Sequence, residues 1–141
     1  MNSKFPIEVA IINLITSYKN LIATKMRPLG LHPGQDMILL ELLKNDGISQ
    51  NKLVVSLCVD HSTIAKSVSR MIKSGLVQTK KSTKDKRVTL VSLTEHGRDL
   101  ATQVEDVWLE SERNATLGFS AEEQQLFVEM LEHITHNLNN Q

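Results

Sequence analysis

The spacing of apolar residues changes from a helical to a strand pattern in the middle of this chain, and that change restricts the possible folds more than any other feature of the sequence. In residues 61–73 the apolar positions are Ile64, Val68, Met71 and Ile72, spaced i, i+4, i+7 and i+8, which is typical of an amphipathic helix. Residues 76–81 and 88–93 are instead rich in Val, Leu and Thr, which indicates two short strands. The polar and basic residues 82–87 between them predict an exposed hairpin loop.

Another short helix is expected just before helix 61–73, separated from it by a tight turn. Ser49 suits the N-cap of this short helix, and Asp60 suits the N-cap of the helix that follows. Gly75 stands where a helix is commonly followed by glycine. Two helices joined by a tight turn and followed by a two-stranded hairpin predict a winged helix-turn-helix. The inward face of the short helix is expected to contain Leu53, Val54 and Leu57.

Longer helical patterns flank this motif. Pro6 suits the first turn of a helix that should end near residues 28–30, and Pro33 opens a helix so rich in apolar residues that we expect it to be buried. Thr94 should cap a long helix, and Ser120 followed by Glu123 predicts a capping box for a final one. The predicted fold class is mainly α with a small β-hairpin wing (α+β), in a single domain of residues 1–141 whose residues 32–94 form the winged lobe.

The formal net charge is zero, from 16 basic and 16 acidic residues, but these charges are unevenly distributed. Residues 1–48 carry five basic and four acidic residues, a net charge of +1. Residues 49–94 carry nine basic and two acidic residues, a net charge of +7, and residues 95–141 carry two basic and ten acidic residues, a net charge of −8. A concentrated basic segment is typical of a nucleic-acid-binding lobe, so the zero sum does not exclude such a partner.

Helix 61–73 places polar and basic side chains opposite its apolar stripe, where they are candidates to contact base edges and phosphates. These candidates are Ser62, Thr63, Lys66, Ser67, Arg70 and Lys73. Ser49 and Gln50 are candidate donors to phosphate, and the wing contributes Lys80, Lys81, Lys84, Lys86 and Arg87. A run of charge is usually only a solvated face. Here nine of the 16 basic residues lie in a third of the chain, on the elements that a winged helix presents to double-stranded DNA, so DNA binding is favoured.

Four segments also carry a family resemblance: Asp60-His61-Ser62-Thr63-Ile64, residues 69–77 (SRMIKSGLV), Asp85-Lys86-Arg87, and residues 90–97 (LVSLTEHG). In these segments the chain resembles the MarR family of bacterial transcriptional regulators. The resemblance implies a homodimer whose intertwined terminal helices, residues 1–31 and 95–141, lie above two winged lobes. It also implies a regulator, mostly a repressor, that binds a pseudo-palindromic operator and is released by a small-molecule effector.

The resemblance assigns roles to several residues of this chain. An aspartate at the position of Asp60 often pairs with the wing arginine, here Arg87, which would brace the wing against helix 61–73. Lys86 stands where the family more often has arginine, so minor-groove contacts there are less well supported. The family commonly binds small aromatic effectors in a crevice beside the dimer helices. The residues expected to line such a crevice here are Tyr18, Met26, His32 and Met37.

The apolar stripes of the first and last helices predict self-association. Such a small chain cannot cover both stripes as a monomer, whereas pairing across a two-fold axis would bury them. The alternative is that each stripe packs on its own domain. A dimer also supplies two recognition helices for successive major grooves. The residues expected to pair are Ile11, Leu14, Tyr18, Phe127, Leu131, Ile134 and Leu138.

The remaining sequence signals are weak. The single Cys58 excludes a disulfide framework and is interpreted as a small buried side chain, with oxidant sensing as the alternative. The histidines form no metal-binding pattern, and no catalytic or cofactor motif occurs, so we expect no metal, cofactor or enzyme activity. With no membrane span or signal peptide recognisable, we expect a cytoplasmic protein. The family resemblance implies a bacterial protein, associated with the nucleoid when bound to DNA. A protein-interaction adaptor and a sequence-tolerant architectural protein remain alternative functions.

Overall fold

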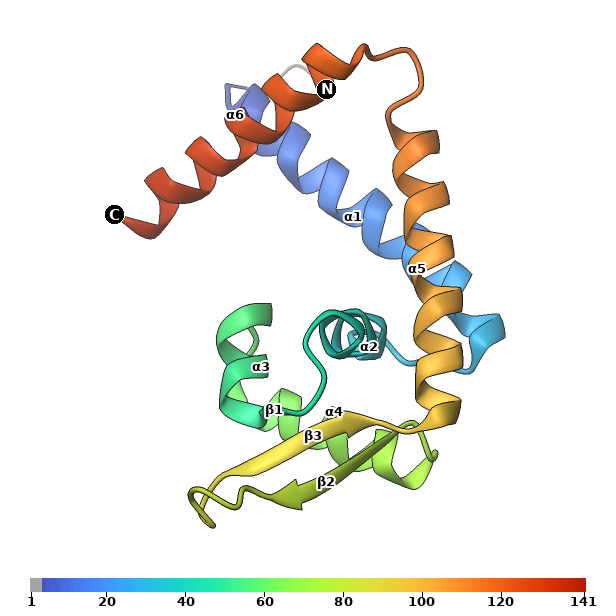
Figure 1. Ribbon diagram of the computed structural model, residues 1–141. Helices are drawn as coiled ribbons and strands as arrows, with labels where there is room; N and C mark the ends of the chain where they lie inside the picture. The colour runs from blue at the N-terminus through green and yellow to red at the C-terminus, as the bar shows by residue number, and fades with distance from the viewer. Residues whose placement is uncertain (1–3) are drawn as a thin grey trace. The chain divides into compact units, whose positions relative to one another are not determined.

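The computed structural model describes residues 4–141, and it confirms a mainly helical fold with a small sheet (Figure 1). The chain forms two compact units, Met1–Val107 and Trp108–Gln141. The elements in chain order are α1 (Pro6–Met26), a 3-10 turn (Arg27–Leu29), α2 (Gln35–Lys44), β1 (Ile48–Ser49), α3 (Gln50–Leu57), α4 (His61–Lys73), β2 (Val77–Lys81), β3 (Thr89–Leu93), α5 (Glu95–Ala115) and α6 (Ala121–Asn139).

The sheet has one more strand than the sequence predicts. Its three strands are antiparallel in the order β1-β3-β2, with Val77 opposite Leu93 and Lys81 opposite Thr89 in the hairpin. The added strand β1 pairs Ile48 with Val91. Two residues carry no detectable alternation of apolar and polar side chains, so β1 escapes sequence analysis. It fastens the start of α3 to the middle of the hairpin.

The core of the first unit lies where α2 meets α3, α4 and the sheet. Leu39 and Leu42 of α2 and Leu53 of α3 have no exposed surface, which agrees with the expected burial of helix α2. Helix α4 contributes Ile64, Val68 and Met71, as its spacing predicts. Ile72, the fourth apolar residue in the helical pattern, is 43% exposed. At i+8 from Ile64 it lies at the edge of the stripe rather than on it.

The predicted caps of the two helix-turn-helix helices are present. The Ser49 side chain accepts a hydrogen bond from the Lys52 N–H at 3.1 Å, and the Asp60 side chain accepts one from the Thr63 N–H at 2.9 Å. Gly75 follows α4 with a φ of +75°, a left-handed conformation that glycine adopts without strain. These contacts fix where each helix begins and where α4 ends.

Cys58 contradicts its predicted burial. It ends α3 in the left-handed conformation, with φ +53°, and its side chain is exposed. The expectation rested on the general tendency of cysteine to be buried. The turn geometry overrides that tendency because a left-handed residue after a helix turns the chain, and here the side chain, away from the core.

The first turn of α5 contacts the turn that follows α4. The Thr94 N–H donates to the Leu76 carbonyl at 3.1 Å, and the Thr94 hydroxyl donates to the Gly75 carbonyl at 2.5 Å. A Cβ atom placed on Gly97 would lie 1.9 Å from the Leu76 oxygen, so only glycine permits this approach. On the side of α5 that faces the turn after α2, the Asp46 carboxylate forms an ion pair with Arg98 at 2.9 Å. The same carboxylate accepts from the N–H of Leu93, the last residue of β3, also at 2.9 Å.

The second unit contains the end of α5 and all of α6. Ser120 and Glu123 form the predicted capping box, with donor–acceptor distances of 3.1 and 2.9 Å. The hydrogen bond from the Ser120 N–H lowers the pKa of Glu123 below its ordinary value. Several large apolar side chains of α6 are exposed, namely Leu126, Phe127, Val128, Met130 and Leu138. Among residues 4–141, no helix is long and apolar enough to span a membrane.

Candidate nucleic-acid interface

The face of α4 opposite the core is a row of exposed polar and basic side chains, as predicted. Ile64, Val68 and Met71 anchor the inner face, each at most 2% exposed. The predicted contact residues on the outer face are exposed, except Ser67, which is half-buried: Ser62, Thr63, Lys66, Ser67, Arg70 and Lys73. Helix α4 can therefore lie against a ligand without losing its own packing.

The start of α4 is a compact hydrogen-bonded cluster around Asp60. Its two carboxylate oxygens accept from the Ser62 hydroxyl at 2.7 Å and the Thr63 hydroxyl at 2.8 Å, in addition to the Thr63 N–H. Donation from the Ser62 hydroxyl is the main cause that lowers the pKa of Asp60 to about 2. Both hydroxyl groups are thereby held in fixed positions at the N-terminal end of the helix that carries the basic face.

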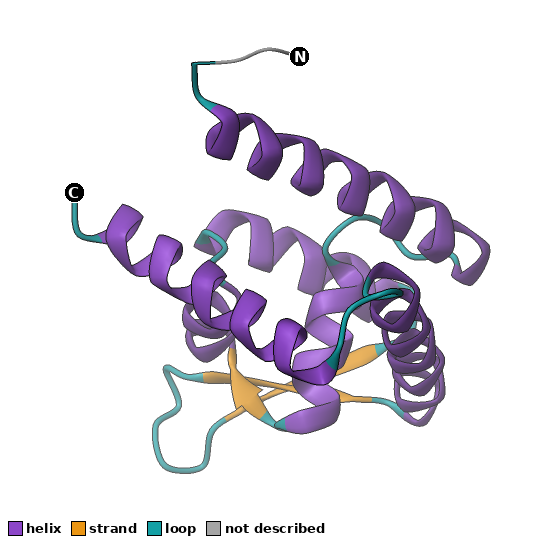
Figure 2. Cartoon of the chain, turned by 90° about the horizontal axis from the view of Figure 1, so that it is seen from above, coloured by secondary structure: helices purple, strands orange, loops and turns teal. Residues whose placement is uncertain are grey.

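The wing is an ordered loop with a basic surface. The Ser82 N–H donates to the Val88 carbonyl and the Val88 N–H donates to the Asp85 carbonyl, both at 2.9 Å, which closes the loop beyond the two strands. Figure 2 shows this loop projecting beyond the helices, between the two strands of the hairpin. The predicted wing residues are all exposed: Lys80, Lys81, Lys84, Lys86 and Arg87.

The expected pairing of Asp60 with Arg87 is wrong. The Arg87 guanidinium instead forms two hydrogen bonds with Asp85, at 3.1 and 3.2 Å, and its donation lowers the pKa of Asp85. The Asp60 oxygens are occupied by its neighbours Ser62 and Thr63. Asp60 and Arg87 thus each pair with side chains no more than three residues away in sequence, instead of with each other. Arg87 stays available, because its side chain is 91% exposed.

The start of α3 adds to the polar surface. Ser49 and Gln50 are both half-buried, and the Ser49 oxygen already accepts a hydrogen bond as the N-cap. Lys52 is exposed on the first turn of α3 and was not among the predicted contact residues. A basic residue three positions after the predicted N-cap Ser49, in the most basic block of the chain, was the signal that could have identified it.

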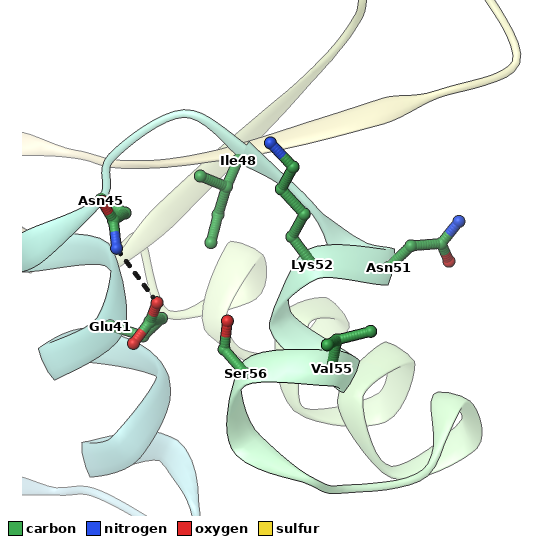
Figure 3. Close-up of a pocket in the computed structure, with 7 residues that line it drawn as sticks. All are labelled: Glu41, Asn45, Ile48, Asn51, Lys52, Val55 and Ser56. Atoms are coloured by element: carbon green, nitrogen blue, oxygen red, sulfur yellow. Dashed lines mark hydrogen bonds between the residues drawn. The ribbon is translucent and has the colours of Figure 1, made fainter.

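A surface hollow of about 420 Å³ lies between α2, β1 and α3 (Figure 3). At its margin the Glu41 carboxylate accepts from the Asn45 side-chain amide at 3.2 Å. It is lined by Glu41, Asn45, Ile48, Asn51, Lys52, Val55 and Ser56. None of the residues predicted to line an effector crevice belongs to it.

The four predicted effector residues differ in exposure. Met26 is buried at 2% exposure, Tyr18 is half-buried, and His32 and Met37 are exposed. Their role stays a prediction. In the described part of the chain no three His, Cys, Asp or Glu side chains are grouped to hold a metal ion.

The fold and this surface define a class: winged helix-turn-helix proteins, in which a recognition helix and a wing contact DNA. Comparison with known proteins specifies the class further. The family model for ArnR1-like winged-helix domains matches residues 36–109. An HTH-type transcriptional regulator of Bacillus subtilis, YdgJ, is 29% identical over 114 residues, 79% of this chain and 68% of that protein. The HTH-type transcriptional repressor IacR of Pseudomonas putida is 39% identical over 77 residues, 55% of this chain and 46% of that protein.

Among solved structures, a MarR family transcriptional regulator from Listeria monocytogenes, complexed with a 26mer DNA, superposes with a TM-score of 0.88. It is 25% identical, and the match covers 99% of this chain and 91% of that one. This chain belongs to the MarR family of winged-helix transcriptional regulators. The expectation that it is not an enzyme is confirmed, because the family consists of DNA-binding regulators.

Proposed function

We propose that this protein is a homodimeric repressor that binds a pseudo-palindromic operator in bacterial DNA through α4 and the wing. The observation that carries the proposal is the exposed basic face of α4 beside an exposed basic wing, with the α4 core side fully packed. The Listeria monocytogenes relative was solved with DNA, and the Pseudomonas putida relative is a repressor. Lys66, Arg70 and Arg87 are the principal proposed contacts.

Arg87 has the geometry of a pre-positioned contact. Its guanidinium is held by two hydrogen bonds to Asp85 and is still almost entirely exposed. An arginine fixed in this way loses less side-chain entropy when it binds phosphate or a groove wall. Asp85 therefore orients the arginine at the tip of the wing.

Two further observations support dimerisation. On α1, large apolar side chains are exposed, among them Ile7, Leu14 and Ile15 at 66, 46 and 48%. On α6, Phe127 and Leu138 are 45 and 60% exposed. Of the residues predicted to pair, Leu14 and these two are exposed, and Ile11, Tyr18, Leu131 and Ile134 are half-buried. A second copy that covered these side chains would remove them from water. Sedimentation analysis should give twice the chain mass at micromolar concentration.

The DNA-binding proposal is tested by fluorescence anisotropy with the duplex upstream of the protein's own gene. Affinity should fall steeply with salt, with a slope of about −0.9 per neutralised phosphate in a plot of log K against log salt. Arg87→Ala should weaken binding and reduce that slope by about one phosphate contact. Lys19→Ala removes the same charge from α1 and is the matched control, expected to bind as the parent does.

Other outcomes identify the alternative functions. Salt-independent binding, or Arg87→Ala binding as tightly as the parent, would refute the proposed interface. Equal affinity for all duplexes would indicate an architectural protein, and co-purification of a partner protein without any DNA shift would indicate an adaptor. Effector release belongs to the same proposal. Small aromatic compounds that dissociate the complex should do so less well in a His32→Ala variant.

A further inference from the structure

The first turn of α5 is attached to the winged lobe at two places that differ in strength. We call this attachment the α5 junction, and it consists of Asp46, Thr94, Gly97 and Arg98 together with the backbone of residues 75–76. One side meets the turn after α4 through Thr94 and Gly97. The other side contacts Asp46, which lies in the turn after α2. The partners of Asp46 are distant in sequence: Leu93 is 47 residues away and Arg98 is 52 residues away.

The side toward α4 is stiff. Thr94 donates to the Gly75 and Leu76 carbonyls through its hydroxyl and also to Leu76 through its N–H. The Gly97 N–H in turn donates to the Thr94 hydroxyl oxygen at 3.0 Å. Because the Gly97 Cα lies almost against the Leu76 carbonyl, this contact acts as a pivot that α5 cannot slide along.

On the side toward α2, the contact made by α5 itself is one ion pair at the surface, since the other partner of Asp46, Leu93, lies in β3. The Arg98 guanidinium donates to the second Asp46 oxygen at 2.9 Å, and the two side chains are 50 and 37% exposed. Surface ion pairs contribute little to folding stability, so this contact can be removed without unfolding the lobe. Leu100, Ala101 and Val104 on the following turns of α5 are buried. The pair therefore does not hold α5 alone, and its effect is a small adjustment of the tilt of a packed helix about the pivot.

A small tilt of α5 has a large effect at its far end. Its 21 residues make a helix about 30 Å long, at a rise of about 1.5 Å per residue. A tilt of about 6° at the first turn therefore moves the far end by about 3 Å, close to the rise of about 3.4 Å per base pair of DNA. A displacement of that size would change the preferred distance between two half-sites by one base pair.

We propose that Asp46 is a positioning residue whose pairing with Arg98 sets the spacing between the two half-sites that the dimer selects. This inference rests on the proposed function, because it requires a dimer that binds two half-sites. Asp46 does not contact DNA in this scheme. It acts through α5, because the tilt of α5 sets the position of its winged lobe relative to the winged lobe of the second copy in the dimer.

The test uses the full-length Asp46→Asn variant. Asparagine keeps an oxygen that accepts from the Leu93 N–H and loses the charge that attracts Arg98. Asp99→Asn is the matched control, since it removes the same charge at an exposed position next to Arg98 on α5. The probes come from a duplex selected by the parent protein from random-sequence DNA. They carry the two half-sites at the selected spacing, at one base pair more or fewer, or a single half-site only.

The parent protein and Asp99→Asn should prefer the selected spacing by tenfold or more. Asp46→Asn should reduce that preference three- to tenfold while its affinity for the single half-site stays within twofold. Arg98→Gln should have the same effect, and the double variant should add nothing to either single change because both break one contact. Arg98→Gln also serves as the second variant if Asp46→Asn does not fold, which thermal unfolding followed by circular dichroism would reveal.

The inference is overturned if Asp46→Asn keeps the parent's spacing preference, or if its affinity falls equally on the single half-site. It is also overturned if the parent binds the selected duplex without any spacing preference. If the parent selects no duplex at all, the proposed DNA-binding function itself fails. These outcomes separate the two proposals.

Discussion

Replacing Gly97 with alanine should destabilise this protein, although alanine is the better helix former. Inside α5, alanine gains about 1 kcal/mol over glycine in intrinsic helix propensity. The new Cβ atom, however, would lie 1.9 Å from the Leu76 oxygen and 2.8 Å from its carbonyl carbon. Real Cβ contacts essentially never fall below 3.0 Å, so one of the two backbones must move by more than an ångström.

That movement removes other contacts. The Leu76 oxygen accepts from both the N–H and the hydroxyl of Thr94, at 3.1 and 3.2 Å, and both distances lengthen as it withdraws. Two lost hydrogen bonds cost about 1 kcal/mol each, and forcing extra volume into a packed contact costs about 1–3 kcal/mol. Subtracting the gain of about 1 kcal/mol in propensity leaves a net loss of about 2–4 kcal/mol in the free energy of unfolding.

Urea unfolding followed by circular dichroism measures this difference. The midpoint should fall with little change in the slope of free energy against urea. Gln103→Ala, at an exposed position of the same helix, is the control and should stay within about 0.5 kcal/mol of the parent. A Gly97→Ala variant as stable as the parent, or more stable, would refute the close approach on which the α5 junction depends.

Three further predictions concern the stability of the core, the loss of stability at low pH and the reactivity of the Cys58 thiol. Leu42→Ala, at a fully buried position, should lower the free energy of unfolding by about 2–5 kcal/mol, and a loss below 1 kcal/mol would contradict the assigned core. The pKa of Asp60 lies near 2 in the folded protein, below its unfolded value of 3.8. The contribution of its ionised carboxylate to the free energy of unfolding is therefore complete above pH 4 and is lost as the pH falls through 2. The melting temperatures of parent and Asp60→Ala should therefore differ at pH 6 and converge near pH 2. Cys58 should react with a thiol reagent in the native protein, whereas reaction only after addition of denaturant would contradict its exposure.

The parts of the fold that the sequence predicted correctly depend on local signals. The period of apolar residues and the caps Ser49 and Asp60 lie within one or two helical turns of the elements they define. The features that escaped prediction join distant segments. Strand β1 pairs Ile48 with Val91, and Asp46 pairs with Arg98, and neither contact leaves a trace in neighbouring residues.

The same distinction applies to the candidate site. Which side chains of α4 are exposed follows from helical periodicity, so the predicted face agrees with the structure. Hydrogen-bond partners do not follow from it. Arg87 was assigned to Asp60 on the family resemblance, but Asp85 is only two residues away and needs no second loop to be ordered. Cys58 was assigned by residue type, whereas its left-handed backbone decides its exposure.

The register of the hairpin has a consequence for how this regulator can diversify. Val77 faces Leu93 at the base of the hairpin, and Lys81 faces Thr89 at its tip, so the strands close before the loop begins. Insertions, deletions or charge changes in residues 82–88 therefore leave the start of α5 where it is. The length and chemistry of the wing tip can evolve independently of the α5 junction.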